Sequence, residues 1–191
     1  HCIVFTTGYQ ANLGMIAGLA GPRDTVYLDA DSHSSIYDGC TLSGAKLVRF
    51  RHNDAADLDK RLSRSEDGEE GGRLVVLEGI YSMLGDRAPL KDFVELKKKH
   101  KFQLLVDEAH SFGVLGPNGR GLADEAGLEA GADFVVGTFS KSIGSIGGFG
   151  AGDHPLFETL RYAMRPYMFT ASSSPATIAT SIAAVKTLAR E

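Results

Sequence analysis

The stretch LLVDEAHSFG, residues 104–113, joins a short apolar run to a group of polar side chains. Its first residues have the composition of a buried strand, and Asp107 and His110 follow where that strand would end. Residues 107–110 also spell Asp-Glu-Ala-His, the acidic box of one class of helicases. The stretch therefore fits either a nucleotide site or two side chains that face a different ligand.

Short apolar runs alternate with helical patterns on both sides of this stretch. Strands are predicted at residues 26–28, 46–50, 74–77, 102–106 and 134–136, and helices at residues 9–19, 34–42, 55–62 and 89–99. Strands that alternate with helices predict an α/β fold with a mostly parallel, doubly wound sheet. Residues 65–72, rich in Gly and Glu, are predicted to form a surface loop without a site.

Ligands bind at the carboxyl ends of the strands in such sheets, so we expect the site among the polar residues found there. The candidates form four groups: Asp107 with His110, Thr138 with Ser140 and Lys141, residues 78–82, and Gly8 with Tyr9 before the first helix.

Composition and motif content argue against a helicase. The chain has 191 residues, of which 43% are hydrophobic and 23% charged, as is typical of a soluble globular protein. Its net charge of -4 supplies no basic field for a phosphate backbone. A nucleotide-driven motor also needs the motif G-x-x-x-x-G-K-[ST], and no Gly-Lys pair occurs in the sequence. We therefore expect no nucleic-acid partner.

The cysteines and the chain ends bear on location and extent. Cys2 and Cys40 are too few for a disulfide framework and favour a reducing compartment. No apolar run approaches the roughly 20 residues that span a bilayer, and no signal peptide is present, so we expect a cytoplasmic protein. The chain starts at His1 and stops at Glu191, inside a helical pattern that begins near Pro175, so we expect it to be part of a longer enzyme.

Lys141 is the candidate with the most specific chemistry. It follows a buried-type strand, next to small hydroxyl residues and before a glycine-rich turn. An ammonium group near low-dielectric walls has a lowered pKa, which frees the amine as a nucleophile toward an aldehyde. Pyridoxal phosphate requires such an amine, an acid for its ring nitrogen, a surface for its ring face and donors for its phosphate. A lysine in a serine-rich turn is otherwise an ordinary surface residue, so its companions decide between the two interpretations.

Three further residues match the requirements of the pyridoxal ring. Asp107 can keep the ring nitrogen protonated, His110 can reach the ring hydroxyl, and His33 can stack its imidazole on the ring face. Each has a plainer alternative: an aspartate in this place can cap a helix or bind a metal, and a histidine can be a structural hydrogen-bonding residue.

The phosphate requirement is met by residues at a helix start and after a strand. Gly8 and Tyr9 precede the rest of a predicted helix, whose first N–H groups and dipole favour an anion. Thr138 and Ser140 can add hydroxyl groups. The plainer alternative for the glycine is a simple turn.

Seven motifs with these residues resemble the α-oxoamine synthases, a pyridoxal-phosphate family of aminotransferase-like fold. In order along nearly the whole chain they are TTGYQANLG, DADSHSSIYDG, FRHND, LEGIYSMLGDRAPL, LLVDEAHSFGVLGPNGRG, GTFSKSIGSIGGFG and RPYMFTAS. The resemblance implies the large domain of the fold-type I pyridoxal-phosphate-dependent transferases, an α/β/α sandwich. Residues 1–191 would be this pyridoxal-phosphate-binding large domain, with an N-terminal segment and a C-terminal small domain outside the chain.

The resemblance also implies roles for individual residues. Around the ring, Lys141 would form the Schiff base with pyridoxal 5'-phosphate, Asp107 would pair with the ring nitrogen, His110 would contact the ring oxygen and His33 would stack over the ring. The remaining cofactor contacts would come from Gly8, Tyr9, Ser82, Thr138 and Ser140, and from Thr170, which would reach the cofactor of a neighbouring subunit. A homodimer with shared active sites is therefore expected, and no metal site.

The activity implied by the resemblance is a decarboxylating Claisen condensation of an amino acid with an acyl-coenzyme A. The motifs TFSKSIGSIGGF and RPYMFTAS are most similar to members that join L-serine and palmitoyl-CoA into 3-oxosphinganine, the first step of sphingolipid synthesis. The alternatives are 8-amino-7-oxononanoate synthase or glycine C-acetyltransferase activity, although the former members tend to have glycine at the position of Ser140.

Two alternatives from other classes are disfavoured by the motifs. A non-catalytic partner subunit would lack the Schiff-base lysine, whereas Lys141 is present. A cysteine-sulfur lyase or aminotransferase is disfavoured by the pair DEAHSFG and GTFSKS. The arginine that binds the substrate carboxylate in the family is expected beyond residue 191.

Overall fold

The computed structural model describes residues 1–64 and 71–190. In this part of the chain seven strands form one sheet in the order β1-β7-β6-β5-β4-β2-β3. The strands are β1 (Cys2–Phe5), β2 (Thr25–Asp29), β3 (Lys46–Phe50), β4 (Arg73–Glu78), β5 (Gln103–Asp107), β6 (Phe134–Thr138) and β7 (Gly148–Gly152). Of the predicted surface loop 65–72, residues 65–70 lie outside the described residues.

Helices connect most of the strands. They are α1 (Gly8–Leu19), α2 (Ser34–Ser43), α3 (Ala55–Arg64), α4 (Leu90–Lys99), α5 (Leu122–Glu125), α6 (Arg165–Met168) and α7 (Pro175–Leu188), with the 3-10 helices η1 (Glu129–Gly131) and η2 (Phe157–Tyr162). Every strand and helix predicted from the apolar patterns is present, and no end differs by more than two residues from its predicted position. The helical pattern expected to begin near residue 175 is α7.

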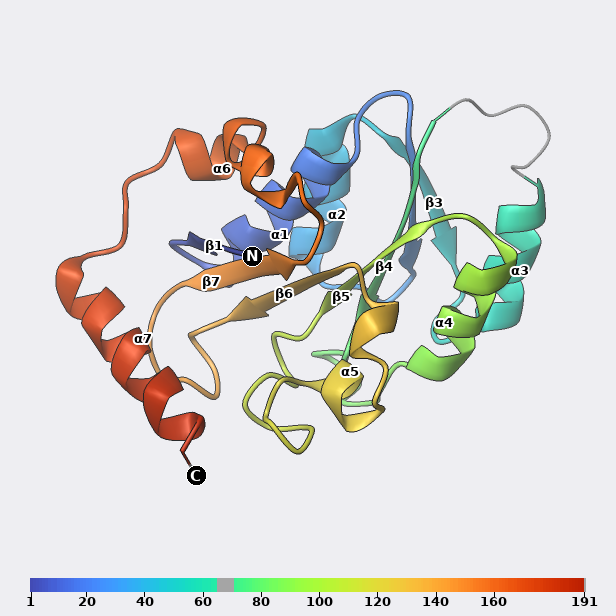
Figure 1. Ribbon diagram of the computed structural model, residues 1–191. Coiled ribbons are helices and arrows are strands. Elements are labelled where there is room, and N and C mark those ends of the chain that lie inside the picture. The colour runs from blue at the N-terminus through green and yellow to red at the C-terminus, as the bar shows by residue number, and fades with distance from the viewer. Residues whose placement is uncertain (65–70, 191) are drawn as a thin grey trace.

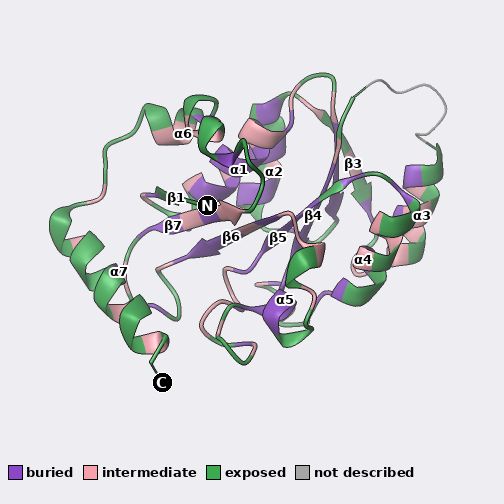
Figure 2. Cartoon of the chain, in the orientation of Figure 1, coloured by how far each residue is buried: buried purple, intermediate pink, exposed green. Residues whose placement is uncertain are grey.

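The sheet is mostly parallel, as predicted, and carries helices on both faces (Figure 1). The β2 strand is buried along its whole length, and its side chains alternate between two separate hydrophobic clusters. Val26 and Leu28 pack on the side of α1 and α2, whereas Tyr27 packs on the side of α3 and α4. Burial on both faces is what a central strand of an α/β/α sandwich requires, and Figure 2 shows the sheet as the most buried layer.

The β7 strand was not predicted, because its sequence GFGAG lacks the branched residues that favour strands. The glycine-rich turn expected after Lys141 ends before Gly148, and residues 148–152 pair antiparallel with both β6 and β1. The glycines allow α1 to approach the sheet closely. A Cβ on Gly148 would lie 2.6 Å from the Cα of Gly8, and one on Gly150 would lie 2.3 Å from the sulfur of Met15.

The last helix, α7, extends beside the sheet edge that contains β1 and β7 and is mostly exposed (Figures 1 and 2). Within residues 1–64 and 71–190, none of the helices combines the length and apolar character needed to cross a membrane.

Candidate active site

A cavity of about 240 Å³ lies at the carboxyl ends of β5 and β6, beside the start of α1. Eight of the ten predicted site residues line it: Gly8, Tyr9, His33, Asp107, His110, Thr138, Ser140 and Lys141. They come from four separate segments of the chain, which meet here because parallel strands end at the same edge of the sheet.

Asp107 is the last residue of β5 and is only 3% exposed. Its Oδ1 atom accepts the backbone N–H of Ala109 at 2.9 Å, and its Oδ2 atom accepts Nδ2 of Asn12 at 2.7 Å. Each carboxylate oxygen has two lone pairs. The carboxylate is therefore held in one orientation and can still accept a hydrogen bond from a ligand in the cavity.

Asn12 lies on the buried side of α1 and links two walls of the cavity. Its Nδ2 atom donates to Asp107 and, at 2.9 Å, to Oγ of Ser35 at the start of α2. Its Oδ1 atom has no hydrogen-bond partner among the described residues. An unpaired polar atom that is buried this deeply normally signals a ligand or a water molecule.

His33 is held in a defined orientation at the N-terminus of α2. Its Nδ1 atom accepts the backbone N–H of Ser35 at 3.2 Å, and the Ser35 hydroxyl lies 2.7 Å from the same nitrogen. Because Nδ1 is an acceptor, we assign the ring proton to Nε2. The ring of Tyr9 meets the imidazole edge-on at a centroid distance of 6.0 Å.

The start of α1 forms the anion-binding end of the cavity. The first-turn N–H groups of Gly8 and Tyr9 have no helical carbonyl to pair with, as at any helix N-terminus. A Cβ on Gly8 would lie 2.8 Å from the side chain of Thr138, so only glycine allows this close approach. The hydroxyls of Thr138 and Ser140 lie 2.9 Å apart beside it.

Lys141 lies in the hairpin that joins β6 to β7, so the antiparallel strand β7 determines its position. The backbone N–H of Phe139 donates to the carbonyl of Gly147 at 2.9 Å and closes the hairpin. The hydroxyl of Ser142 donates to the carbonyl of Phe112 at 2.5 Å. The lysine hairpin is thereby fastened to the segment that carries Asp107 and His110.

The cavity shifts the pKa values of three side chains. Partial burial lowers the pKa of Lys141, although the carboxylates of Asp107 and Glu78 oppose this shift. Burial and the nearby Lys141 ammonium lower the pKa of His110. Burial, and then the charge of Asp107, raise the pKa of Glu78 to about 8. The pKa values of the Lys141 amine and the Glu78 carboxylic acid are thus both shifted toward neutral pH, as is common in sites that transfer protons.

The model of the aminotransferase class I and II family matches residues 1–189. The chain belongs to this family. It is 59% identical over 186 residues to serine palmitoyltransferase from Sphingomonas paucimobilis, covering 97% of this chain and 44% of that relative. It is 46% identical over 191 residues to a putative 8-amino-7-oxononanoate synthase from Desulforudis audaxviator, covering 100% of this chain and 49% of that relative.

A solved structure of similar sequence is a variant of serine palmitoyltransferase from S. paucimobilis with a bound PLP–myriocin aldimine. It matches with a TM-score of 0.95 and 58% identity, over 99% of this chain and 47% of that chain. These matches confirm the resemblance and the fold type predicted from the sequence. The chain spans about half the length of the relatives that it matches.

Two predicted site residues of this family member are not among those that line the cavity. Ser82 lies in the segment after β4, where its backbone N–H is hydrogen-bonded to Glu78. Thr170 follows α6, and its hydroxyl accepts Nε2 of Gln10 at 3.3 Å. Their predicted cofactor contacts therefore stay predictions.

Seven residues of the cavity were not predicted as site residues, and Asn12, Ser35 and Glu78 are among them. Glu78 was recognised only as part of a polar segment after a strand. For Asn12, the available signal is a polar residue within the apolar face of a helix, since α1 buries it together with Ala11, Met15 and Ile16.

Glu108, the second acidic residue of the DEAH stretch, is fully buried and binds backbone N–H groups. It accepts the N–H of Leu122 at 2.9 Å and of Ala123 at 3.0 Å, and it also accepts the hydroxyl of Ser111. Burial raises the pKa of Glu108. It therefore caps α5, whereas Asp107 beside it faces the cavity.

Replacing this cap is expected to destabilise the fold. Glu108→Ala leaves two buried N–H groups without acceptors, which should lower the free energy of unfolding by about 3 kcal/mol. The exposed Glu129, paired with Arg120 at 3.2 Å, provides the control, because Glu129→Ala should cost about 0.5 kcal/mol or less. Urea denaturation of both variants tests the assignment, and equal losses would contradict it.

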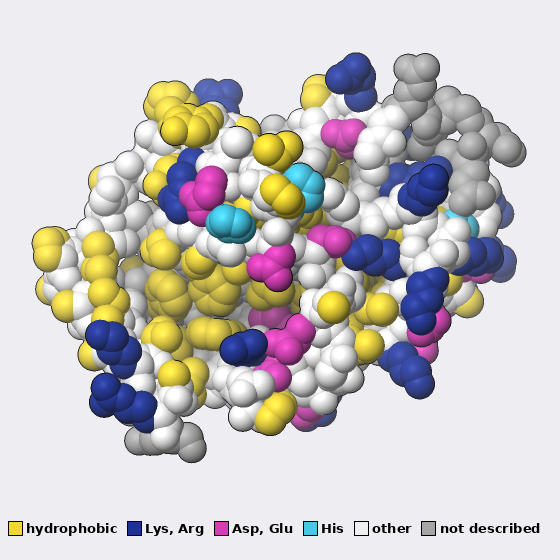
Figure 3. Space-filling view, viewed as in Figure 1, with side chains coloured by type: hydrophobic (Ala, Val, Ile, Leu, Met, Phe, Trp, Pro, Cys, Tyr) yellow, Lys and Arg dark blue, Asp and Glu magenta, His cyan; other side chains and the backbone are white. Residues whose placement is uncertain are grey.

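A second cavity, of about 300 Å³, lies between α7 and the edge of the sheet. Its walls include the apolar side chains Val4, Phe139, Ile146, Ile178, Ile182 and Val185. Figure 3 shows hydrophobic side chains gathered beside α7. The cavity touches the lysine hairpin through Phe139 but contains no carboxylate or imidazole.

Proposed function

We propose that the chain is the cofactor-binding part of a pyridoxal-phosphate-dependent acyltransferase that condenses an amino acid with an acyl-coenzyme A and releases carbon dioxide. The observation that carries the proposal is one cavity lined by an amine, a buried carboxylate, two imidazoles and a helix N-terminus. These groups match the aldehyde, ring nitrogen, ring face and phosphate of pyridoxal phosphate.

The residues present fit this cofactor. Asn12 has a buried oxygen without a partner at the cavity wall, and Asp107 is fixed by hydrogen bonds to both of its oxygens. The close contact between Gly8 and Thr138 brings backbone N–H groups and a hydroxyl to one point. We assign the phosphate to this end and the ring to the space between Asp107 and His33.

Pyridoxal phosphate, when bound, supplies an electron-withdrawing ring that stabilises negative charge on the substrate carbon. Asp107 would hold the proton on the ring nitrogen, and His33 would cover one ring face. His110 would donate a hydrogen bond to the ring oxygen. The ε-amine of Lys141 would hold the aldehyde carbon of the cofactor and would accept the α-proton of the substrate, because its lowered pKa keeps more of the amine unprotonated.

The remaining assignments concern the phosphate and the subunits. Gly8 and Tyr9 would bind the phosphate through backbone N–H groups, and Thr138 and Ser140 through hydroxyls. Ser82 would reach the polar edge of the cofactor. Large apolar side chains left exposed on the chain, among them Phe169, Tyr162 and Met83, support a homodimer in which Thr170 reaches the partner's cofactor.

For the substrates we propose L-serine and palmitoyl-CoA, as the first step of sphingolipid synthesis. The identity of 58–59% to proteins named serine palmitoyltransferase supports this choice. The second candidate is the 8-amino-7-oxononanoate synthase reaction, favoured by relatives of that name at 43–46% identity. We also place the enzyme in the cytoplasm, because Cys2 and Cys40, both in the described part of the chain, are free thiols.

A substrate screen of the full-length protein tests the activity. Serine, alanine and glycine are each combined with palmitoyl, pimeloyl and acetyl thioesters of coenzyme A, and free thiol and carbon dioxide are measured. Serine with the palmitoyl thioester should give the highest kcat/KM. A preference for alanine with the pimeloyl thioester would select the second candidate, and no thiol release with any pair would reject the acyltransferase.

A further inference from the structure

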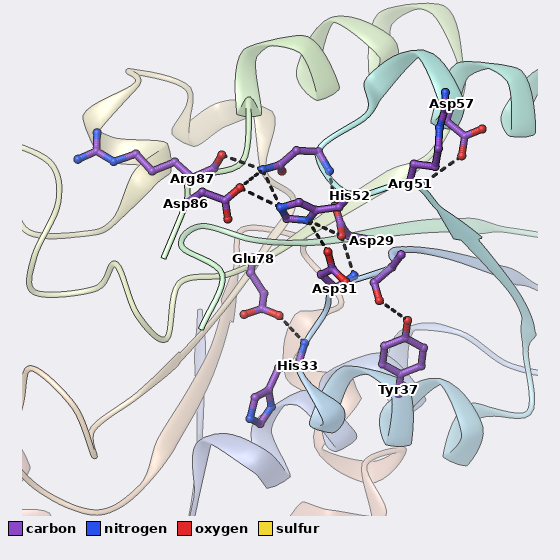
Figure 4. Close-up of polar contacts among 12 residues, drawn as sticks. Asp29, Asp31, His33, Tyr37, Arg51, His52, Asp57, Glu78, Asp86 and Arg87 are labelled. Carbon is purple, nitrogen blue, oxygen red and sulfur yellow. Dashed lines mark hydrogen bonds and ion pairs between the residues drawn. The ribbon is translucent and has the colours of Figure 1, made fainter. Parts of the chain in front are cut away.

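A partly buried ionic bridge is centred on His52 (Figure 4), and none of its members lines the cofactor cavity. His52, between β3 and α3, hydrogen-bonds through Nδ1 to Asp29 at 2.8 Å and through Nε2 to Asp86 at 2.9 Å. Asp29 ends β2 and is fully buried, whereas the Asp86 side chain is 46% exposed. Both ring nitrogens can donate to these carboxylates at the same time only when both carry protons, that is, when the imidazole is positively charged.

The bridge holds a hairpin that follows β4. In this hairpin, residues 79–88, Ile80 pairs with Arg87 and the N–H of Tyr81 donates to the carbonyl of Asp86 at 2.9 Å. The His52 ring meets the buried Tyr81 ring edge-on at a centroid distance of 4.5 Å. His52 thus contacts both sides of the hairpin, through Tyr81 and through Asp86.

Asn53 strengthens the same junction. It adopts a left-handed backbone conformation with φ of 52°, which asparagine tolerates better than most residues. Its Nδ2 atom donates to Asp86 at 3.0 Å and to the carbonyl of Arg87 at 3.1 Å. Its backbone N–H donates to Asp29 at 2.7 Å. Two consecutive residues therefore tie the hairpin to the end of β2.

The end of β2, to which the hairpin is tied, is also connected to the cavity. Asp29 accepts the N–H of Asp31 at 2.9 Å and so shapes the short segment that leads to His33. Glu78, which does line the cavity, accepts the backbone N–H groups of His33 and of Ser82, the residue after Tyr81. His33 and Ser82, two of the predicted cofactor contacts, therefore lie on segments that the bridge holds in place.

We propose that His52 is a positioning residue, which clamps the hairpin of residues 79–88 against the end of β2 and so sets His33 and Ser82 at the edge of the cofactor cavity. The proposal rests on the proposed function for the identity of the cofactor, but the clamp itself is a property of the apoprotein. His52 acts through Asp29 and Asp86 and does not touch the cofactor.

The bridge should depend on pH in a defined direction. Partial burial opposes the charged ring, but the hydrogen bonds to Asp86 and Asp29 together raise the pKa of His52 above its usual value. Asp31, 3.7 Å from Nδ1, faces the ring as well, and burial raises the pKa of the neighbouring Tyr81. The clamp is therefore complete below the ordinary histidine pKa of about 6.5 and is lost as pH rises through the raised folded-state pKa.

Two variants of the full-length protein test the clamp, with one matched control. His52→Gln removes the positive charge between the two carboxylates. Asp86→Asn removes one charge from a partly exposed site, so it should fold. Glu158→Gln is the control, because this carboxylate pairs with Arg161 at 2.6 Å in an ion pair that does not touch the hairpin. Amide hydrogen exchange of residues 79–88 is measured in the apoprotein, and the dissociation constant of pyridoxal 5'-phosphate by titration.

Both clamp variants should speed exchange in residues 79–88 and weaken cofactor binding about tenfold, while Glu158→Gln matches the wild type. After correction for the intrinsic, base-catalysed exchange rate, the protection of the wild-type hairpin amides should also fall as pH rises, and Asp86→Asn should move the midpoint of that fall to lower pH. Unchanged exchange in both variants would overturn the proposal, as would faster exchange with unchanged cofactor affinity. If the wild type binds no pyridoxal phosphate, the proposed function is wrong. The hydrogen-exchange data on the apoprotein would still test whether His52 holds the hairpin.

Discussion

Lys141→Ala is expected to abolish the visible absorbance of the lysine-linked cofactor and to reduce kcat by about 10⁴-fold, the upper end of what a positioned general base contributes. The reason is that this amine is the only lysine nitrogen at the cavity, in the hairpin between β6 and β7, among the residues that the structure describes. Absorbance spectra of the full-length protein with added pyridoxal phosphate, and single-turnover kinetics, measure the two effects.

Two further variants separate the nucleophile from its charge. Lys141→Arg keeps a cation in the hairpin but offers no amine of suitable pKa, so it should lose the absorbance band as completely as Lys141→Ala. Lys98→Ala removes an exposed lysine that pairs with Glu95 on α4 and should behave as the wild type. A visible band that persists in Lys141→Arg would assign the covalent link to another lysine.

Asp107→Asn is expected to keep the fold and to lower kcat by about 10²- to 10⁴-fold, which is the usual contribution of a positioned acid–base group. An amide has the shape of the carboxylate but cannot hold the proton on the ring nitrogen. The fold should tolerate it, because the amide of Asn12 can turn and offer its unpaired Oδ1 to the new NH₂ group. Kinetics together with thermal denaturation measure both quantities.

The same variant has a second, electrostatic consequence. The Asp107 carboxylate raises the pKa of Lys141 against the effect of burial. Its removal should therefore move the lysine-dependent limb of the pH–rate profile to lower pH. Asp133→Asn is the control, because this carboxylate lies at the opposite, amino-terminal end of β6 and pairs with Lys97. Near-normal turnover in Asp107→Asn would rule out its assigned role.

The arrangement of the site could be predicted because it follows from sheet geometry. Asp107 and Thr138 end neighbouring parallel strands, so both lie at the same edge of the sheet, where they line one cavity. The apolar runs identified these strands within one or two residues. Residues that follow two of these runs, Asp107, His110, Thr138, Ser140 and Lys141, make up five of the eight predicted residues that line the cavity.

Other features depended on contacts that no local pattern encodes. The glycines of β7 weaken its strand signal, yet they are needed because α1 packs against them. Asp107 and Glu108 are adjacent and chemically alike, and only the folded chain directs one to the cavity and the other to the N-terminus of α5. Nothing in the apolar pattern distinguishes these two carboxylates.

The order of apolar and polar residues thus predicted the doubly wound sheet, the edge of the sheet at which the cavity lies, and the presence of Lys141 at that edge. The long-range contacts decided the rest: which carboxylate faces the cavity, how Asn12 joins α1 to Asp107, and how His52 reaches Asp86 across 34 positions of the chain. The physical reason is that strand and helix periodicities depend on near neighbours, whereas a buried polar group finds its partner only when distant segments pack together.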